Sequence, residues 1–337
     1  MQNTKKNKKQ KHNKSKKTYK IKPHNYSLKE KETIVQQINS ISLEQAERSF
    51  QKLCNLKCKG AIAASAGIQI GNDVVDKFTL IERLNTKGHV GIDFYTFWYN
   101  RAHFSKIEYI KKMLDYYRSR DIAEIRKWKY IFNLYFSSIS IFRPVMAMEI
   151  YCKYTPKIAI LDPTMGWGGR LIGACALNIP KYIGIDSNQY LSEPYRQMID
   201  FVADKTKTKI EVLFQDALTI DYSKLQYDMV FTSPPYYNIE VYRKGTTRKG
   251  TTGKGTTRIF KEKEEWNTEF YKPLFQKTWE NMQTPGYYCL NIPSEIYDEC
   301  CIPILGKYNR KIVLKKQIRK KSAANKYSEY IYIWEKK

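Results

Sequence analysis

The chain has 337 residues and a formal net charge of +26. It contains no run of about 18 apolar residues and no signal-peptide pattern, so composition excludes a membrane-spanning protein and predicts a soluble one, cytoplasmic or nuclear depending on the host. Residues 1–22, 241–261 and 307–337 carry +10, +7 and +9, and the remainder is neutral. A neutral body with three basic segments indicates a polyanionic partner; without an amphipathic apolar stripe, no membrane partner is expected.

The seven cysteines form an odd, scattered set, which argues against a disulfide framework. Cys54 and Cys58 have the spacing of half a metal site. However, no matching second pair follows and the four histidines do not cluster. Ordinary thiols and no metal are therefore expected.

The N-terminal third divides into a tail and a helical region. Residues 1–25, rich in lysine and asparagine, are predicted to be a disordered basic tail. Apolar residues then recur at three- and four-residue spacing, as in Ile107, Ile110 and Leu114, which predicts a mainly helical region over 26–137.

Part of this helical region mixes aromatic and polar residues. The segment 94–101 contains Asn100 and Arg101 beside five aromatic residues and a threonine. Asn100 and Arg101 are candidates for reading base edges, and core packing explains the aromatic residues equally well. No other segment is large enough for a separate recognition domain, so 26–137 is the candidate region for target recognition.

Beyond residue 155, short apolar strands alternate with helical stretches, which predicts a doubly wound, mostly parallel sheet. Ligands bind such sheets at the carboxyl ends of the strands. The predicted strands are 157–161, 182–185, 210–214, 228–232, 287–292, 312–317 and 330–334.

The first predicted strand ends at Asp162 and leads into a turn with glycines at 166, 168 and 169. Glycine permits positive φ and close backbone approach. A dinucleotide fingerprint requires a glycine at position 171, which is Leu171, and the Gly-Lys-Ser/Thr of a phosphate loop is also absent. The turn is therefore predicted to hold something other than a pyrophosphate.

Two further acidic residues follow the next two strands. Asp186 is placed to accept both hydroxyls of a ribose, and Asp216 to accept from an adenine amino group. Either residue alone is more typical of a turn or helix cap. Together with Asp162 they end three successive strands, which predicts one ligand cleft.

The fourth strand stops at Ser233-Pro234-Pro235-Tyr236. Proline fixes φ and lacks an N–H, so the strand cannot continue and its carbonyls face the region beyond the sheet. A hydroxyl and a carbonyl beside an aromatic ring suit a flat substrate with an exocyclic amino group, such as a nucleobase. The polar repeat Lys-Gly-Thr-Thr-Arg/Gly over 244–258 follows and is predicted to be a basic surface loop.

In these motifs, residues 138–337 resemble S-adenosylmethionine-dependent DNA amino-methyltransferases of the N4-cytosine/N6-adenine family, of the Ser-Pro-Pro-Tyr type. The resemblance implies an α/β, Rossmann-like methyltransferase fold with a seven-stranded, mostly parallel sheet after the helical region. It implies S-adenosyl-L-methionine as cofactor, with Asp186 at its ribose and Asp216 at its adenine. The remaining cofactor-binding residues that it implies are Asp162, Pro163, Thr164, Gly166 and Gly168 in the loop, and Phe142, Arg143 and Pro144 at the methionine end.

The resemblance also implies catalytic roles for Ser233, Pro234, Pro235 and Tyr236, with DNA as partner. The serine hydroxyl and the Pro234 carbonyl accept the N–H groups of the target amine, and Tyr236 stacks on an extruded base. Serine at the first position favours cytosine N4 over adenine N6, a reaction typical of restriction–modification. Two alternatives stay open: methylation of an RNA base, and an idle nucleic-acid-binding protein with the same fold.

Overall fold

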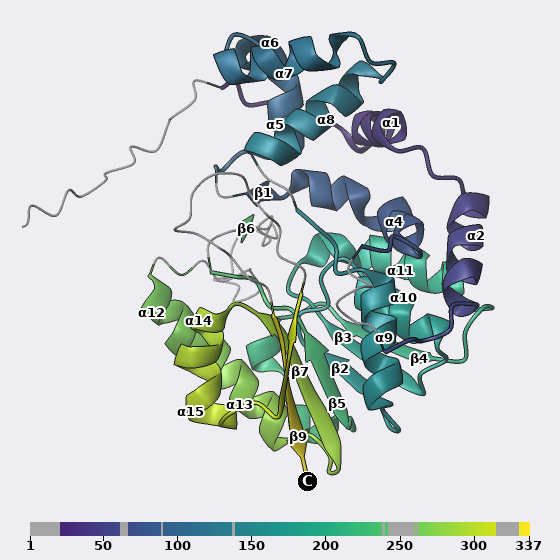
Figure 1. Cartoon of the computed structure of the whole chain (residues 1–337), viewed down its shortest axis with the longest axis vertical. Coiled ribbons are helices and arrows are strands. Elements are labelled where there is room, and N and C mark those ends of the chain that lie inside the picture. Colours follow the sequence, from purple (N-terminus) through teal and green to yellow (C-terminus); the bar gives the residue numbers. More distant parts are fainter. Residues whose placement is uncertain are drawn as a thin grey trace, which may run out of the picture.

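A central β-sheet lies between two layers of helices, and a lobe of further helices lies beyond one end of the sheet (Figure 1). The computed structural model describes residues 21–60, 67–88, 90–136, 139–237, 240–241, 260, 262–314 and 330–337. The repeat at 244–258 and most of the basic tail fall outside the described residues. None of the described helices combines the length and apolar character needed to cross a membrane.

The described residues form a seven-stranded sheet in the order β4-β3-β2-β5-β7-β9-β8. Its strands are β2 (Ile160–Asp162), β3 (Lys181–Ile185), β4 (Lys209–Leu213), β5 (Met229–Thr232), β7 (Gly286–Ile292), β8 (Arg310–Val313) and β9 (Tyr330–Lys336). Neighbouring strands from β4 to β7 are parallel, and β9 is antiparallel to both β7 and β8. This confirms the predicted Rossmann-like methyltransferase fold.

All seven predicted strands are present, and two of them differ from their predicted bounds by three residues or more at one end. The first was expected over 157–161, but β2 begins at Ile160 because the Asp228 carboxylate accepts the N–H groups of residues 157–159 at 2.6–3.0 Å. The strand expected over 312–317 is β8, which ends at Val313; residues 315–317 lie outside the described part.

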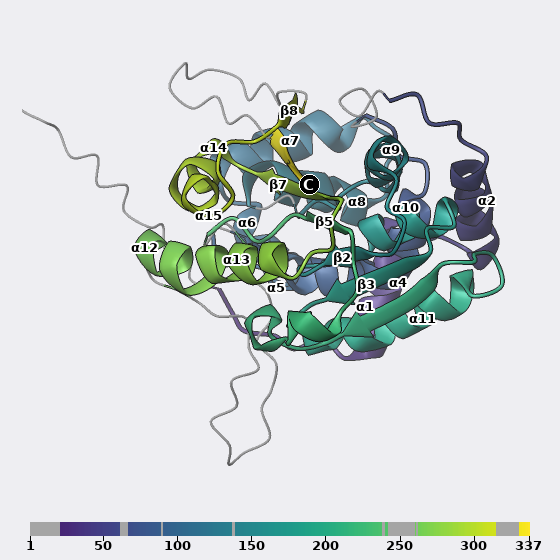
Figure 2. The ribbon, with the colours of Figure 1, turned by 90° about the horizontal axis from the view of Figure 1, so that it is seen from below.

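Side chains alternate between the two faces of the sheet, as a strand requires. Met229 and Phe231 of β5 pack with one helical layer, and Val230 packs with the other. Figure 2 shows α9 and α10 on one side of the sheet and α13 and α15 on the other. The first layer contains α2 (Leu43–Cys54), α4 (Asn72–Asn85), α9 (Pro144–Tyr154), α10 (Gly169–Ala176) and α11 (Ser192–Val202). The second contains α12 (Lys263–Trp266), the π-helix η4 (Asn267–Tyr271), α13 (Lys272–Glu280), α14 (Ser294–Ile296), η5 (Tyr297–Cys301) and α15 (Ile302–Leu305).

The lobe beyond the sheet has its own aromatic core, in which Phe97 contacts Phe104, Trp128 and Phe132 at ring-centroid distances of 4.8–5.5 Å. Its helices are α1 (Leu28–Ile38), α5 (Phe94–Tyr99), α6 (Arg101–Phe104), α7 (Glu108–Arg118) and α8 (Glu124–Tyr135). Most of the described residues between 26 and 137 are helical, and α2 and α4 pack on the sheet layer; the role of this region in target recognition stays a prediction. A short unpredicted strand pair, β1 (Lys87–Gly88) with β6 (Glu240–Val241), joins the two regions.

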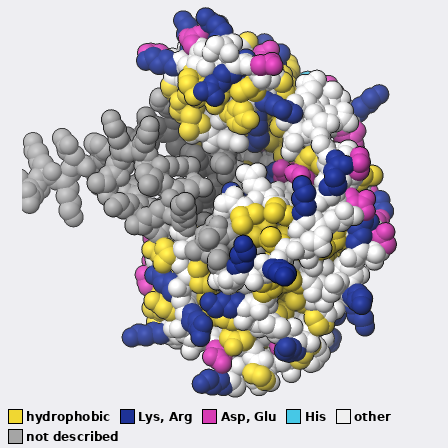
Figure 3. Space-filling model, turned by 45° about the vertical axis from the view of Figure 1, so that its right-hand side comes forward, with side chains coloured by type: hydrophobic (Ala, Val, Ile, Leu, Met, Phe, Trp, Pro, Cys, Tyr) yellow, Lys and Arg dark blue, Asp and Glu magenta, His cyan; other side chains and the backbone are white. Residues whose placement is uncertain are grey.

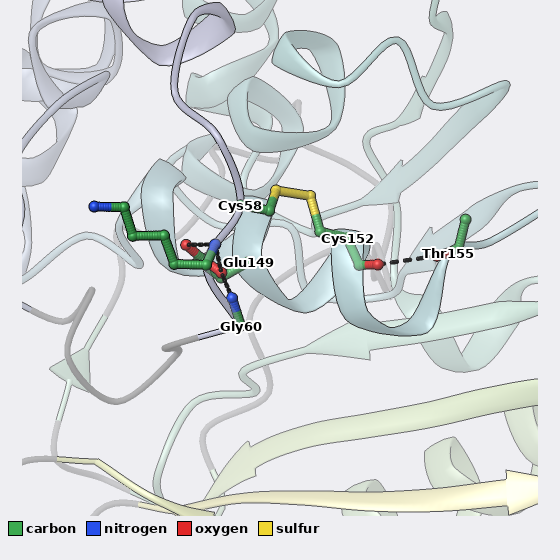
Figure 4. Close-up of a disulfide and its surroundings, with 6 residues drawn as sticks. Cys58, Gly60, Glu149, Cys152 and Thr155 are labelled. Atoms are coloured by element: carbon green, nitrogen blue, oxygen red, sulfur yellow. Dashed lines mark hydrogen bonds between the residues drawn. A yellow bond between two sulfur atoms is a disulfide. The ribbon is translucent and has the colours of Figure 1, made fainter.

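The expectation that the cysteines are all ordinary thiols is wrong for one pair. Cys58, in the segment after α2, forms a disulfide with Cys152 of α9, with Cα atoms 6.4 Å apart (Figure 4). The buried Glu149 carboxylate, one turn earlier on α9, accepts the N–H groups of Lys59 and Gly60 at 2.8–3.1 Å. The sequence could not reveal this pair, because the two cysteines are 94 residues apart and meet only through helix packing.

Candidate active site

The turn between β2 and α10 brings the 139–143 segment against the predicted cofactor loop. Gly166 and Gly168 have φ of +59° and +92°, in the left-handed region that favours glycine. A Cβ at Gly169 would lie 1.8 Å from the carbonyl oxygen of Phe142, so only glycine permits this approach. The structure therefore brings together the loop residues and Phe142, Arg143 and Pro144, which the resemblance assigned to one cofactor.

Asp162 organises this loop from inside. Its carboxylate is fully buried and accepts from Arg170 Nε at 2.6 Å and from the Tyr182 hydroxyl at 2.6 Å. Burial alone would lower the pKa of Arg170, but the adjacent Asp162 carboxylate holds that pKa above its usual range. Because these partners occupy its oxygens, the carboxylate supports the loop, and direct cofactor contact by Asp162 stays a prediction.

Asp186 directly follows β3 and faces the same loop. Its carboxylate accepts the Gly166 N–H at 3.0 Å and the Asn188 N–H at 2.8 Å. Burial raises the pKa of this carboxyl to about 6, against the effect of the two N–H groups. The side chain thus lies beside the glycine turn as a carboxylate whose charge changes in the neutral-to-acid range.

Asp216 follows β4 and caps the short helix η2 (Ala217–Thr219), accepting the Leu218 N–H at 3.0 Å. Since β4, β3 and β2 are parallel neighbours, Asp216, Asp186 and Asp162 all lie at the carboxyl edge of the sheet. The common edge expected from the sequence is confirmed; the individual ligand contacts of these residues stay predictions.

The Ser-Pro-Pro-Tyr turn is joined to the predicted cofactor loop by hydrogen bonds. Thr232, the last residue of β5, donates to Asp162 Oδ1 at 2.8 Å. Its hydroxyl oxygen lies 2.5 Å from that of Thr164, so Thr164 is the donor in this second bond. A continuous chain of contacts therefore connects the end of β2 with the residue that precedes Ser233.

Sequence reasoning missed Asn291, which holds the ends of this turn together. Asn291 lies on β7, next to β5, and is buried. The Ser233 hydroxyl donates to its Oδ1 at 3.3 Å, and the Tyr236 hydroxyl donates to its carbonyl at 2.9 Å. The Ser233 and Tyr236 oxygens are themselves 3.1 Å apart. Tyr236 is thus fixed through its hydroxyl, while its ring remains only partly buried.

Tyr271 was also missed, and it clamps the far side of the turn. Its hydroxyl donates to the Pro235 carbonyl at 2.6 Å and accepts the Tyr237 N–H at 2.9 Å. Tyr237 has φ of +52°, a left-handed conformation that is uncommon for a bulky residue. Among the described residues none donates a hydrogen bond to the Pro234 carbonyl, whereas the Pro235 carbonyl accepts one from Tyr271. Tyr271 ends the π-helix η4, a type of distortion frequent at functional sites.

The expectation that Asn100 reads bases is wrong. Asn100 is buried, and its amide accepts the Lys22 N–H at 2.9 Å while donating to the Lys22 carbonyl at 3.0 Å and the Thr96 carbonyl at 2.9 Å. Arg101 lies over the Trp98 ring at 4.3 Å and donates to the Trp98 carbonyl. The amide is already saturated by backbone groups, so it positions the chain that enters α1.

The residues at this edge fit S-adenosylmethionine in chemical type. A Cβ at Gly166 would meet no atom closer than the Thr164 carbonyl at 3.9 Å, which leaves the concave side of the turn open to a ligand. Two carboxylates, at Asp186 and Asp216, are the acceptors that ribose and adenine groups need. The described residues contain no cluster of three His, Cys, Asp or Glu side chains suited to a metal ion.

No protein-family profile and no curated protein sequence matches this chain. Among solved structures, TrmN from Thermus thermophilus is similar at 13% identity and a TM-score of 0.40, over 58% of this chain and 49% of TrmN. An rRNA methylase from Streptococcus thermophilus is similar at 12% and 0.36, over 59% and 99% of the respective chains. The M. jannaschii tRNA m1G37 methyltransferase is similar at 15% and 0.34, over 60% and 52%. The match thus spans about half of TrmN. Similarity at this level does not indicate which substrate this chain acts on.

Proposed function

We propose that this chain transfers a methyl group from S-adenosylmethionine to an exocyclic amino group of a nucleobase, with cytosine N4 in DNA as the leading acceptor. The observation that carries the proposal is the hydrogen-bond chain from Thr164 through Thr232 to Asp162. It couples a glycine turn on β2 to the Ser-Pro-Pro-Tyr turn on β5. Donor and acceptor sites built on these two neighbouring strands would share one cleft edge.

The cofactor side would be held by residues from three strands. Asp186 would accept from the ribose hydroxyls and Asp216 from the adenine amino group, while the Gly166–Gly168 turn and the Phe142–Pro144 segment would enclose the methionine end. When bound, S-adenosylmethionine supplies an electrophilic methyl group on a sulfonium centre. Asp162 and Arg170 would keep the loop in shape without touching the reacting atoms.

On the acceptor side, the amine is a poor nucleophile because its lone pair is delocalised into the ring. The Ser233 hydroxyl donates its hydrogen bond to Asn291 Oδ1, which leaves the lone pairs of the Ser233 oxygen available for one N–H of the amine. The Pro234 carbonyl accepts the other N–H. These two acceptors favour a pyramidal nitrogen with a localised lone pair, and the proton of the methylated product then passes to solvent. Catalysis would rest on positioning and oriented dipoles.

Tyr236 would stack on the extruded base. Its hydroxyl is tethered to the Asn291 carbonyl, so the ring orientation is set before the base arrives. A preorganised ring loses little side-chain entropy on binding, and base–aromatic stacking stabilises binding by about 1–3 kcal/mol.

Two sets of substitutions test the division of roles. In the double variant Ser233→Ala with Tyr236→Ala, methyl transfer to oligonucleotides should fall at least about 100-fold, since the amine loses an acceptor and the base its stacking partner. Cofactor affinity, measured by calorimetry, should stay within about twofold. Asp186→Ala should have the opposite effect and weaken the affinity for the cofactor directly. Wild-type turnover in the double variant would contradict the assignment of Ser233 and Tyr236.

A further inference from the structure

Two antiparallel helices of the lobe, α7 and α8, present a row of tyrosines to solvent. Tyr116 and Tyr130 are 54% and 48% exposed, which is unusual for rings of this size on one small surface. The rings of Tyr117 and Tyr130 contact each other across the two helices at 5.8 Å. We refer to the following five residues as the tyrosine face: Tyr109, Tyr116, Tyr117, Tyr130 and Tyr135.

The tyrosine face has a layered construction. Tyr109 and Tyr135 contact each other at 4.6 Å, and both pack, with Tyr117, on the aromatic core of the lobe. These three rings anchor the row, whereas Tyr116 and Tyr130 project from it. The outer pair therefore keeps about half of its surface exposed, and Arg120 donates a hydrogen bond to the Tyr116 hydroxyl.

The charge around the tyrosine face is positive. Residues 106–130 contain eight Lys and Arg against four Asp and Glu. One of the eight, Lys129, lies over the Phe94 and Phe132 rings of the lobe core, and Glu108 and Asp115 are already paired with Lys112 and Arg118 at 2.7 Å. Arg120 lies over the Tyr116 ring at 4.4 Å and forms no ion pair with a carboxylate of the described residues. Figure 3 shows hydrophobic and basic side chains intermixed on the surface of this lobe.

We propose that the tyrosine face binds unpaired bases of a nucleic-acid strand, with Tyr116 and Tyr130 as stacking rings and Arg120 contacting the phosphate backbone. Aromatic rings interleaved with cations are the common device for single-stranded nucleic acid, because every base has a π-face and every linkage has a charge. An acidic protein would need the cations but not the exposed rings. A second copy of this chain would bring the same positive charge and repel it.

The lobe lies at the end of the molecule where the candidate site is found. The C-terminus follows β9 at the end of the sheet that is farther from the lobe (Figure 1). Because β9 is antiparallel to β7, the carboxyl ends of β7 and of the strands parallel to it lie at the other end of the sheet, toward the lobe. If the target base of a nucleic-acid strand occupies the Ser-Pro-Pro-Tyr turn, its flanking nucleotides lie at the end of the molecule that carries α7 and α8. In this form the inference rests on the proposed function, but binding by the tyrosine face needs neither cofactor nor turnover.

Photo-crosslinking and affinity measurements test the tyrosine face directly. Single-stranded DNA and RNA oligonucleotides that contain 5-iodouracil are irradiated with the full-length protein, and crosslinked peptides are identified by mass spectrometry. Adducts at Tyr116 or Tyr130 are expected, with the preferred polymer identified by the stronger arm. Tyr116→Ala with Tyr130→Ala should weaken binding at least about 10-fold, and the corresponding Phe variants should restore it.

Salt dependence separates stacking from charge. The Tyr-to-Ala pair should leave the slope of log affinity against log salt unchanged, whereas Arg120→Gln should reduce that slope by about 1. Leu134→Ala is the matched control: Leu134 is an exposed apolar residue of α8, the helix that carries Tyr130, and the variant should bind like wild type. The Ser233→Ala/Tyr236→Ala variant should keep the crosslinks although its methyl transfer falls at least about 100-fold, so failure of methyl transfer and failure of this inference are distinguishable.

Two results would overturn the inference. One is unchanged affinity in the Tyr-to-Ala pair together with crosslinks confined to other parts of the chain. The other is a dimer, seen by sedimentation, that dissociates in the Tyr-to-Ala pair, because a second copy would then cover the tyrosine face.

Discussion

At the scale of single residues, the environment of Asp186 predicts a pH dependence for the proposed cofactor binding. Burial raises the pKa of this carboxyl to about 6, so it is largely protonated below that pH and ionised above it. Ribose hydroxyls donate to the ionised form. We therefore expect the affinity for S-adenosylmethionine to fall as the pH drops through 6 and to be constant above about 7.

Calorimetric titration between pH 5 and 8 measures this effect, with Asp186→Asn as control, which should bind weakly at every pH. The folding stability of the ligand-free protein depends on pH in the opposite direction. The unfolded chain releases the Asp186 proton near its ordinary pKa of about 4, so this group lowers folding stability as the pH rises from about 4 to 6. A wild-type affinity that does not change across pH 6 would rule out Asp186 as the ribose ligand.

Tyr271 provides a second residue-scale prediction, as a positioning residue. Tyr271→Phe removes the hydroxyl that joins the Pro235 carbonyl to the Tyr237 N–H, so the turn should lose its fixed geometry. We expect kcat to fall about 10- to 100-fold, with little change in cofactor affinity. The matched control is Tyr227→Phe, which removes an equally buried hydroxyl bonded to the Thr278 carbonyl at 2.9 Å, away from the turn. Equal losses of kcat in both variants would assign Tyr271 a general structural role.

At the scale of elements, the close approach of the Phe142 carbonyl to the start of α10 is the contact that brings together the two segments proposed to hold the cofactor. Gly169→Ala places a Cβ 1.8 Å from the Phe142 carbonyl, and backbone on both sides must move. We expect a loss of about 3 kcal/mol or more in unfolding free energy and weak cofactor binding. Gly91→Ala is the comparison: φ is +77° there and nothing lies within 4 Å, so only conformational strain of about 1–2 kcal/mol applies. Thermal unfolding and calorimetry distinguish the two; near-wild-type stability in Gly169→Ala would contradict the role of this contact.

The elements also show how far the sequence predicted the fold and site. Strand positions and the acids that follow them were predictable, because apolar runs that end in Asp or in Ser-Pro-Pro-Tyr are local signals. Asn291 and Tyr271 were not, since each meets the turn only through strand pairing or helix packing, from 58 and 36 residues away. The role of Asn100 was misjudged because an amide that caps backbone groups has the same sequence signature as one that reads bases.

At the scale of the whole molecule, charge placement predicts how nucleic acid is held. The tail over residues 1–22 carries ten lysines and no acid. Deleting it should lower the affinity for DNA and flatten the slope of log affinity against log salt, because fewer counterions are released. An uncharged Gly/Ser tail of equal length is the control for chain length and should behave like the deletion. A salt slope unchanged by the deletion would show that the tail makes no phosphate contacts.

The two candidate binding regions occupy one end of the molecule. The glycine turn and the Ser-Pro-Pro-Tyr turn lie at the carboxyl edge of the sheet, and the lobe with its tyrosine face lies beyond that edge (Figure 1). In the proposed function, the sheet edge performs the chemistry while the lobe and the basic segments hold the strand.

Nucleoside analysis after methyl transfer tests the central claim most directly. The full-length protein is incubated with isotopically labelled S-adenosylmethionine and duplex DNA, single-stranded DNA or RNA, and the digested nucleosides are separated by mass spectrometry. Our account predicts labelled N4-methyldeoxycytidine from the wild type, and at least about 100-fold less of it from Ser233→Ala/Tyr236→Ala. If only ribonucleosides are labelled, the substrate is RNA and not DNA. No labelled nucleoside on any polymer, with cofactor binding intact, would contradict the proposed reaction.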